Sequence, residues 1–265
     1  MQDYKVILND MIIAAVGAGQ IIMKYYNGDF SVATKADSTP VTDADIASSD
    51  FILGYLRERY PTFGFLSEEC ADEIDFDGVP TRLGKTHCFI IDPLDGPSSF
   101  VKRSGEFAVS IALSVHNEVT AGVVFAPVTG TLYYALKDLG SYKAYVSEGS
   151  IIPKLFDGER LSVSSRKDKL IAIQSEKRSD ERAESLLAAN EDRLATVLRV
   201  GSCLKGCLIA EGRADIHYRF ASYTKEWDTA GEEIICREAG GVFTDAYGNK
   251  LCANREDYAN VNGIR

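Results

Sequence analysis

Acidic side chains at four places in the chain are the residues best suited to chemistry. They are Glu68 and Glu69 after the run FLS, Asp92 and Asp95 within DPLDG, Asp228 within EWDTAG, and Asp45 within VTDAD. In three of these places the acid stands where a strand or loop enters a helix after an apolar run. Taken singly, each also has a structural interpretation, as an exposed loop acid, a turn residue or a helix N-cap.

The spacing within Asp-Pro-Leu-Asp indicates a cation site. A tight turn there can direct Asp92, Asp95 and the carbonyl of Leu94 toward one point. Two carboxylates that close repel each other unless a cation lies between them. Oxygen ligands suit Mg²⁺ far better than zinc. Metal-assisted hydrolysis of a phosphate ester is the chemistry that such a centre performs, since the ions neutralise the phosphate, activate water and stabilise the leaving oxygen.

The composition excludes several classes of protein. Apolar residues make up 45% and charged residues 26% of the 265 residues, which is typical of globular proteins and excludes disordered and collagen-like chains. The net charge of −10 argues against a protein that binds a nucleic acid polymer. An anionic substrate would therefore need the help of a cation.

The cysteines and the N-terminus predict a cytoplasmic protein without disulfides. The six cysteines contain no C-x-x-C pair, and the three histidines are too few to complete typical zinc sites. The opening MQDYKVILND carries acids where a signal peptide needs a basic and then an apolar run. We expect reduced thiols and no association with a membrane.

Hydrophobic patterns predict helices and then a sheet in the first part of the chain. Apolar residues recur at helical spacing over residues 3–26, and a second helix is expected from Thr42 or Asp43 to Pro61. HCFIID (87–92) is typical of a buried central strand. The runs FAVSIALSV, AGVVFAPV, GTLYYAL and SYKAYV, separated by turn residues, predict an antiparallel meander.

Beyond residue 153 the pattern alternates between strands and helices. LIAIQ, ATVLRVG and ADIHYRF are predicted as strands, whereas DERAESLLAANED, SCLKGCLIAEG and TAGEEIICREAGG are predicted as helices. We expect an α/β protein with an α+β lobe over residues 1–150 and an α/β lobe over residues 151–265. Trp227, His217, Tyr133 and Tyr134 are predicted as packing or strand residues. Lys102 and Arg103 are either a surface pair or contacts to the substrate or a loop.

Three ordered segments carry a family resemblance. FLSEE, DPLDGPSSF and EWDTAGEEIICREAGG resemble the signature segments of the magnesium-dependent, lithium-sensitive inositol monophosphatase superfamily. KADSTPVTDADIAS, FVKRSGEFAVSIAL, GVVFAPV and GSCLKGCLIAEGRADIHYRF are most similar to its bacterial 3'(2'),5'-bisphosphate nucleotidase branch. The resemblance implies a layered αβαβα sandwich of the inositol monophosphatase and fructose-1,6-bisphosphatase type. It further implies removal of the 3'-phosphate of adenosine 3',5'-bisphosphate to give AMP, within sulfur metabolism.

The resemblance also implies roles for the acids. Glu68, Asp92 and the Leu94 carbonyl would bind a first Mg²⁺ ion, and Asp92, Asp95 and Asp228 a second. A third, weakly held ion would rely on Glu68 and water, and Asp45 would help to orient the attacking water. Two or three Mg²⁺ ions are therefore expected.

The substrate contacts follow from the same resemblance. The phosphate would rest on backbone N–H groups after Gly96, where a helix begins. Gly201 and Ser202 would border the ribose and base, and Lys205 and Arg219 would bind the 5'-phosphate. Lys205 as a solvated helix residue and Arg219 as half of a structural ion pair remain open alternatives.

The sequence departs from the family pattern at two positions. Pro97 stands where the family has a threonine whose hydroxyl helps to position the attacking water, and proline offers neither a hydroxyl nor an N–H. Ser98 could take over, or Asp45 could suffice at a reduced rate, or turnover could be poor. Proline suits the first helical position, so the fold should be unaffected. Arg178 stands where such nucleotidases offer a histidine to the substrate.

Three functions are therefore compared. The first is the nucleotidase, acting on adenosine 3',5'-bisphosphate, with phosphoadenosine phosphosulfate and inositol phosphates as further candidate substrates. The second is a phosphatase of inositol monophosphates or bisphosphates. The third is a catalytically weak nucleotide-binding protein, suggested by Pro97. The expected partner is a small nucleotide, and the expected assembly a monomer or a homodimer.

Overall fold

The fold is described here from a computed structural model of the chain. It describes residues 3–34, 40–70, 72–76, 78–147, 153–176, 180–221 and 224–265. Two short strands, β1 (Val32–Thr34) and β2 (Pro40–Thr42), form an antiparallel pair before the second helix. The 3-10 helices are Thr81–Gly84 and Glu191–Arg193.

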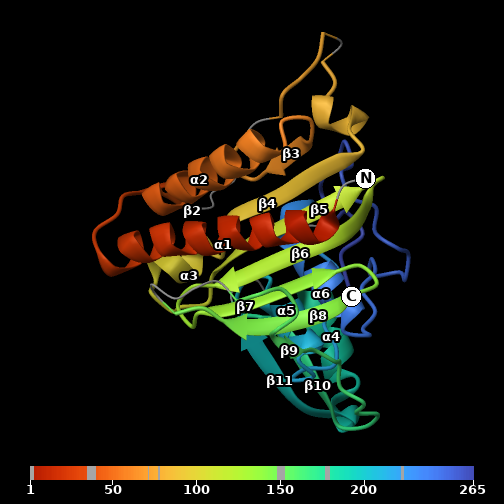
Figure 1. The fold of residues 1–265 in the computed structure, drawn as a ribbon. Helices are drawn as coiled ribbons and strands as arrows, with labels where there is room; N and C mark the ends of the chain where they lie inside the picture. The colour runs from red at the N-terminus through yellow and green to blue at the C-terminus, as the bar shows by residue number, and fades with distance from the viewer. Residues whose placement is uncertain are drawn as a thin grey trace.

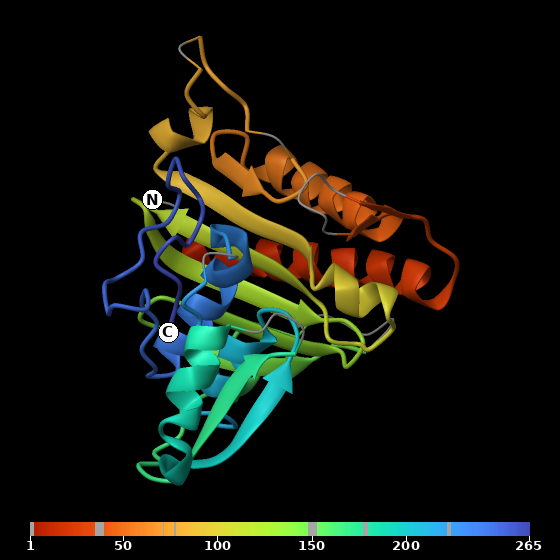
Figure 2. The ribbon, with the colours of Figure 1, turned by 180° about the vertical axis from the view of Figure 1, so that it is seen from behind.

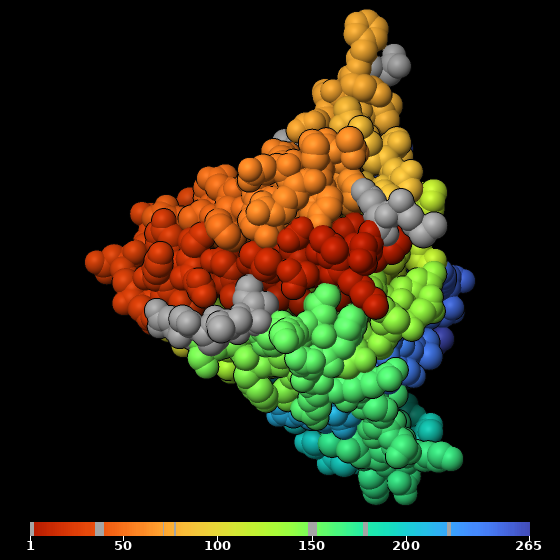
Figure 3. Space-filling model, viewed as in Figure 1, coloured from red at the N-terminus to blue at the C-terminus, as the bar shows by residue number. Residues whose placement is uncertain are grey.

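Two long helices form the outer layer, as the sequence predicts. Helix α1 (Tyr4–Asn27) begins after Asp3, whose Oδ1 accepts a hydrogen bond from the N–H of Lys5 at 2.9 Å. Helix α2 (Asp43–Arg59) begins with a capping box between Thr42 and Asp45. The two helices lie side by side and cover one face of the main sheet (Figures 1 and 3). By length and mean hydropathy alone α1 could span a membrane, but more than half of its apolar window is buried inside the protein.

The main sheet has seven strands in sequential order and contains the predicted meander. Strand β3 pairs with β4 in parallel, and every later neighbouring pair is antiparallel. The strands are β3 (Gly64–Ser67), β4 (His87–Asp95), β5 (Ala108–Val115), β6 (Glu118–Ala126), β7 (Thr131–Leu136), β8 (Gly140–Tyr145) and β9 (Glu159–Arg160). Strands β5 and β7 are almost wholly buried because helices cover both faces of the sheet.

Three further layers complete the fold. Helices α5 (Leu204–Ala210) and α6 (Glu226–Glu238) pack against each other, and α6 packs on the second face of the sheet. Beyond them lie the parallel strands β10 (Leu170–Ser175) and β11 (Leu194–Val200) with α4 (Glu181–Ala188), as Figure 2 shows. The order helices, sheet, helices, sheet, helix confirms the expected αβαβα sandwich.

Two local predictions need correction. Strand β4 does not stop at Asp92 in a tight turn; it continues to Asp95 through a register irregularity against β5. Residues 214–220, predicted as a strand, make only isolated bridges, from Ile216 to Ala172 and from Arg219 to Ile264. Asp180 binds the N–H groups of Phe220 and Ala221, which prevents them from joining a ladder. The boundary at residue 150 lies outside the described residues and stays a prediction.

Candidate active site

A cavity of about 150 Å³ brings together most of the residues singled out in the sequence. Its walls come from the ends of β3 and β4, the start of α3 (Pro97–Val101), the segment before α5, and the first turns of α6. Among its lining residues are Glu68, Asp92, Asp95, Gly96, Pro97, Ser98, Gly201, Ser202, Lys205, Arg219 and Asp228. Both predicted lobes therefore contribute to one site.

Three carboxylates form the centre of this cavity. Glu68, Asp92 and Asp228 each offer an oxygen, and these oxygens lie within 4.8 Å of one another. Glu68 follows β3, and its N–H donates to the carbonyl of Ile91 on the parallel strand β4 at 3.2 Å. Asp228 is in the first turn of α6, where its Oδ2 accepts from the N–H of Lys225 at 2.6 Å. Strand pairing and helix capping thus hold residues that are far apart in sequence in one cluster.

The surroundings of Asp92 fit a bound cation. Its Oδ1 accepts from the N–H of Leu94 at 3.1 Å, whereas its Oδ2 is buried without a hydrogen-bond partner among the described residues. Burial raises the pKa of Asp92 well above its usual value, and the neighbouring carboxylates, first Glu68 and then Asp95, raise it further. A hard divalent cation such as Mg²⁺ would satisfy the orphaned oxygen and offset the repulsion.

Three predicted residues surround the cluster rather than join it directly. Asp95 lines the cavity, and its Oδ2 accepts a hydrogen bond from the N–H of Cys203. Burial raises the pKa of Asp95, and the nearby ammonium of Lys205 opposes this rise. Leu94 is buried in β4 between the two aspartates. Asp45 is buried in α2, and its Oδ2 accepts from the N–H and the hydroxyl of Thr42 at 2.8 and 2.6 Å.

The segment Gly96-Pro97-Ser98 begins a short helix beside the carboxylates. Gly96 has a φ of 94°, and a Cβ there would lie 2.9 Å from the carbonyl oxygen of Glu106, so only glycine fits. Pro97 occupies the first turn of α3, where its missing N–H does not interrupt the helix. Pro97 is compatible with the fold, as expected.

The same cavity is lined by the residues expected to bind the nucleotide. Gly201 donates its N–H to Glu106 Oε2 at 2.8 Å, and Ser202 adopts a φ of 57°. Lys205 is buried rather than solvated, and its ammonium donates to the carbonyl of Ser202. Arg219 is also buried and lines the same cavity. Two buried cations therefore line the same cavity as the carboxylates.

Two of the lining residues that the sequence analysis did not assign to the site are His217 and Glu232. His217, predicted as a strand residue, lies outside the named strands and is 8% exposed. Glu232 is in α6, one turn after Asp228, and its Oε2 accepts from the N–H of Gly206 at 2.8 Å. The four-residue spacing from Asp228 places both acids on one helix face, so this signal was readable in the sequence.

Other residues singled out in the sequence have structural roles or lie outside the description. Arg103 donates to the carbonyls of Tyr26 and, at 2.9 Å, of Gly28, so it anchors the end of α1. Trp227 packs in the core between α6 and the sheet, as predicted. Tyr133 and Tyr134 are buried in β7, also as predicted. Arg178 lies outside the described residues.

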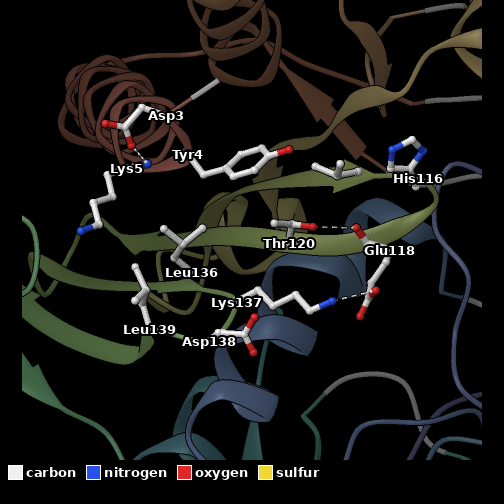
Figure 4. Close-up of a pocket in the computed structure, with 11 residues that line it drawn as sticks. Asp3, Tyr4, Lys5, His116, Glu118, Thr120, Leu136, Lys137, Asp138 and Leu139 are labelled. Carbon is white, nitrogen blue, oxygen red and sulfur yellow. Dashed lines mark hydrogen bonds and ion pairs between the residues drawn. The ribbon is translucent and has the colours of Figure 1, made fainter. Parts of the chain in front are cut away.

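A larger hollow elsewhere on the surface lacks such a cluster. It has a volume of about 570 Å³ and lies between the start of α1 and strands β5 to β7 (Figure 4). Its polar groups bind one another, as in the contact between Lys137 and Glu118 at 2.9 Å. The arrangement of opposite charges there is that of an ordinary surface ion pair.

The fold and the site together define a class: a layered α/β enzyme whose cavity brings a carboxylate cluster together with buried basic side chains. The chain belongs to the inositol monophosphatase family, whose model matches residues 3–264.

Individual relatives agree with this assignment. The chain is 35% identical over 256 residues to the 3'(2'),5'-bisphosphate nucleotidase CysQ of Escherichia coli (strain K12), covering 96% of each protein. It is 33% identical over 247 residues to inositol monophosphatase 2 of Homo sapiens, covering 89% of this chain and 79% of that protein. The crystal structure of CysQ from Bacteroides thetaiotaomicron matches with a TM-score of 0.81 and 33% identity, over 97% of this chain and 96% of that one.

Proposed function

We propose that this protein is a magnesium-dependent 3'(2'),5'-bisphosphate nucleotidase that converts adenosine 3',5'-bisphosphate and water to AMP and phosphate. The observation that carries the proposal is one cavity lined both by a carboxylate cluster and by two buried cations, Lys205 and Arg219. A substrate with two phosphates fits this lining, since one phosphate can bind at the carboxylates through their cations and the other at Lys205 and Arg219. The similarity to the nucleotidase CysQ supports the same substrate.

The carboxylates supply the cation site in this proposal. Glu68, Asp92, Asp95, Asp228 and the Leu94 carbonyl would hold two or three Mg²⁺ ions. When bound, these ions would neutralise the phosphate, lower the pKa of water and stabilise the leaving oxygen. In the overall reaction the oxygen of water bonds to phosphorus, the ester bond to the ribose 3'-oxygen breaks, and a proton ends on that oxygen.

The protein's own residues position the reacting groups. Lys205 and Arg219 would hold the 5'-phosphate with charge-assisted hydrogen bonds, and their rigid burial would orient the 3'-phosphate toward the acids. Backbone N–H groups after Gly96 would bind the reacting phosphate. Asp45 and Ser98 would take over the orientation of water, because Pro97 has no hydroxyl.

Several finer properties belong to the same proposal. We propose that the enzyme is inhibited by lithium, acts in sulfur metabolism, and is a cytoplasmic protein that does not bind membranes. We also propose that the working assembly is a monomer or a homodimer that acts on small molecules and not on nucleic acid polymers. For the substrate site, Arg178 would approach a phosphate or the adenine.

The test compares phosphate release from adenosine 3',5'-bisphosphate and from inositol 1-phosphate, with Mg²⁺, with EDTA, and with millimolar LiCl. We expect release from the nucleotide that needs Mg²⁺ and is inhibited by Li⁺. Lys205→Met should reduce kcat/KM for the bisphosphate by about 10-fold or more, since it removes a charged hydrogen bond. The same variant should affect inositol 1-phosphate, which has no second phosphate, much less. No release from the nucleotide by the wild type would refute the proposal.

Two alternatives have specific observations behind them. The match to inositol monophosphatase 2 favours an inositol phosphatase, and a clear preference for inositol 1-phosphate would establish it. Pro97 in the first turn of α3 favours a binding protein with poor turnover. Micromolar binding of the nucleotide by calorimetry, with turnover that stays low in Pro97→Thr, would establish that function.

A further inference from the structure

His217 has a buried ring nitrogen without a partner. Its Nδ1 lies 2.7 Å from the carbonyl oxygen of Ile173. A carbonyl oxygen can only accept, so Nδ1 carries the ring proton. In the neutral ring Nε2 is then a pure acceptor. Nε2 is buried and has no hydrogen-bond partner among the described residues. A buried polar atom of this kind is costly to leave unsatisfied, which points to a group that arrives with a ligand.

The surroundings keep the ring in this state near neutral pH. Burial lowers the pKa of His217 to about 3, and the neighbouring cations Lys205 and Arg219 contribute to the decrease. The hydrogen bond from Nδ1 to the Ile173 carbonyl and the charge of Asp180 favour the protonated ring, but burial outweighs both. The geometry and the electrostatics therefore agree on a neutral ring.

The backbone that follows His217 is held in place beside the substrate cavity. The N–H of Arg219 donates to the Ile264 carbonyl at 2.8 Å, and Asp180 accepts from the N–H groups of Phe220 and Ala221 at 2.6 and 2.8 Å. His217 lies in a wall between the substrate cavity and a neighbouring one of about 440 Å³. Of the two cavities, only the substrate cavity is also lined by Lys205 and Arg219, the cations whose charges act on the His217 ring.

We propose that His217 determines substrate specificity by accepting, at Nε2, a hydrogen bond from an O–H or N–H group of the substrate. The proposal rests on the proposed nucleotidase function. Lys205 and Arg219 can only donate, so they suit phosphate oxygens. Nε2 has the opposite character and would repel a phosphate oxygen. In adenosine 3',5'-bisphosphate, the groups that can donate to it are the ribose 2'-hydroxyl and the adenine 6-amino group.

The test combines variants with substrate analogues. His217→Asn keeps a donor for the Ile173 carbonyl but has nothing at the Nε2 position, whereas His217→Gln places an amide near that position. His116, which lies in an exposed turn with a φ of 49°, gives a matched control in His116→Asn. Each protein is assayed for kcat/KM with adenosine 3',5'-bisphosphate, its 2'-deoxy analogue, and the purine riboside analogue that lacks the 6-amino group.

We expect the wild type and His116→Asn to prefer the parent substrate over one of the two analogues by about 10-fold or more. In His217→Asn that preference should fall to within about 2-fold, because without the Nε2 acceptor the parent substrate and the analogue make the same contacts. In His217→Gln the preference should partly return. The analogue that shows this pattern identifies the donor as the 2'-hydroxyl or the 6-amino group.

Two results would overturn the inference, and they are distinguishable from each other. If the wild type hydrolyses the parent substrate and His217→Asn lowers kcat/KM equally for all three compounds, His217 is structural while the nucleotidase function stands. If the wild type releases no phosphate from the parent nucleotide, the proposed function fails, and the specificity role fails with it. Thermal unfolding of each variant shows that the compared proteins are folded.

Discussion

Two buried carboxylates, Glu226 at the start of α6 and Asp92 on β4, differ in what surrounds them. Glu226 accepts from the N–H groups of Asn254 and Arg255 at 2.6 and 2.8 Å, and from Arg255 Nε at 2.9 Å. Asp92 lies close to Asp228, the residue two positions after Glu226 in α6. One carboxylate oxygen of Asp92 is buried without any hydrogen-bond partner among the described residues. Burial raises the pKa of both residues. At Glu226 the donors of Arg255 and Asn254 then lower it, whereas at Asp92 the neighbouring acids raise it further.

This difference separates a structural carboxylate from a functional one. The guanidinium of Arg255 supplies the counter-charge of Glu226, so this carboxylate needs no external cation. In the part of the chain that the structure describes, the charges that act on Asp92 are those of other carboxylates, first Glu68 and then Asp95. An external cation stabilises the protein most where buried carboxylates have other carboxylates as their neighbours. Substitutions at the two residues should therefore have opposite effects on stability.

The largest expected effect is the loss of activity in Asp92→Asn. The amide is a poor ligand for a hard cation, so phosphate release should fall on the order of 10²-fold to 10³-fold, similar to the loss of a main electrostatic group in other enzymes. In EDTA the same variant should unfold at a higher temperature than the wild type, because it removes a carboxylate from a repelling cluster. Phosphate release and thermal unfolding measure the two effects. A lower unfolding temperature in EDTA would contradict the view that the cluster is strained.

Pro97→Thr addresses the helix start beside the carboxylates in the same cavity. Threonine would supply both a hydroxyl and an N–H at the first turn of α3, so we expect kcat to rise by about 10-fold to 100-fold. Unfolding should be little changed, since threonine also fits a helix start. Steady-state kinetics with adenosine 3',5'-bisphosphate measure the change. An unchanged kcat would mean that Asp45 or Ser98 already orients the water, or that another step limits turnover.

Glu226→Gln provides the structural counterpart to Asp92→Asn. Both oxygens of Glu226 accept from N–H donors, so an amide NH₂ must face at least one donor. We expect a loss of about 2 kcal/mol in the free energy of unfolding, typical of a broken buried hydrogen bond. Phosphate release at a temperature well below unfolding should change little. Urea unfolding measures the loss, and an equal loss of activity and stability would place Glu226 within the functional cluster.

The sequence was sufficient to predict the elements that position the site, because their signals are local. The apolar spacing of residues 3–26 and the alternation of β-rich runs with turns depend on neighbours in the chain, and both predictions are confirmed. The clustering of Glu68, Asp92 and Asp228 was expected from motif order and resemblance, and the structure brings these three residues together.

The remaining features depend on contacts between distant segments. His217 became visible only through the Ile173 carbonyl on β10, which fixes its proton. The segment around it departs from a strand because Asp180, 40 residues earlier than Phe220, takes its N–H groups. Glu232 fits because Gly206 on α5 has no Cβ, which would lie 2.7 Å from the Glu232 carboxylate. The contacts of His217 with Ile173 and of Asp180 with Phe220 leave no periodic pattern in the sequence. For Glu232 the four-residue spacing from Asp228 could be read, but its contact with Gly206 could not.

The smallest expected effect concerns Glu232 and pH. Burial raises the pKa of Glu232 from 4.5 to about 8, opposed mainly by Lys205. Between these two pH values the folded protein retains a proton that the unfolded chain releases, so this residue lowers stability as pH rises through that window. A glutamine at this position would be neutral at every pH, which makes Glu232→Gln the test. In EDTA, its gain in unfolding temperature over the wild type should be small at pH 5 and should increase toward pH 8.

Glu118 on the surface gives the control with the opposite sign. Hydrogen bonds from Lys250 and Lys137 lower the pKa of Glu118 to about 2, so its stabilising contribution is present above pH 4.5 and is lost as pH falls toward 2. Glu118→Gln should therefore lower the unfolding temperature modestly at pH 7, because partly exposed pairs contribute little, and the difference should vanish at low pH. If Glu232→Gln instead followed the same pH trend as Glu118→Gln, Glu232 would be charged in the folded protein. It would then resemble Glu118, a carboxylate whose charge is paired within the chain, rather than the cluster around Asp92.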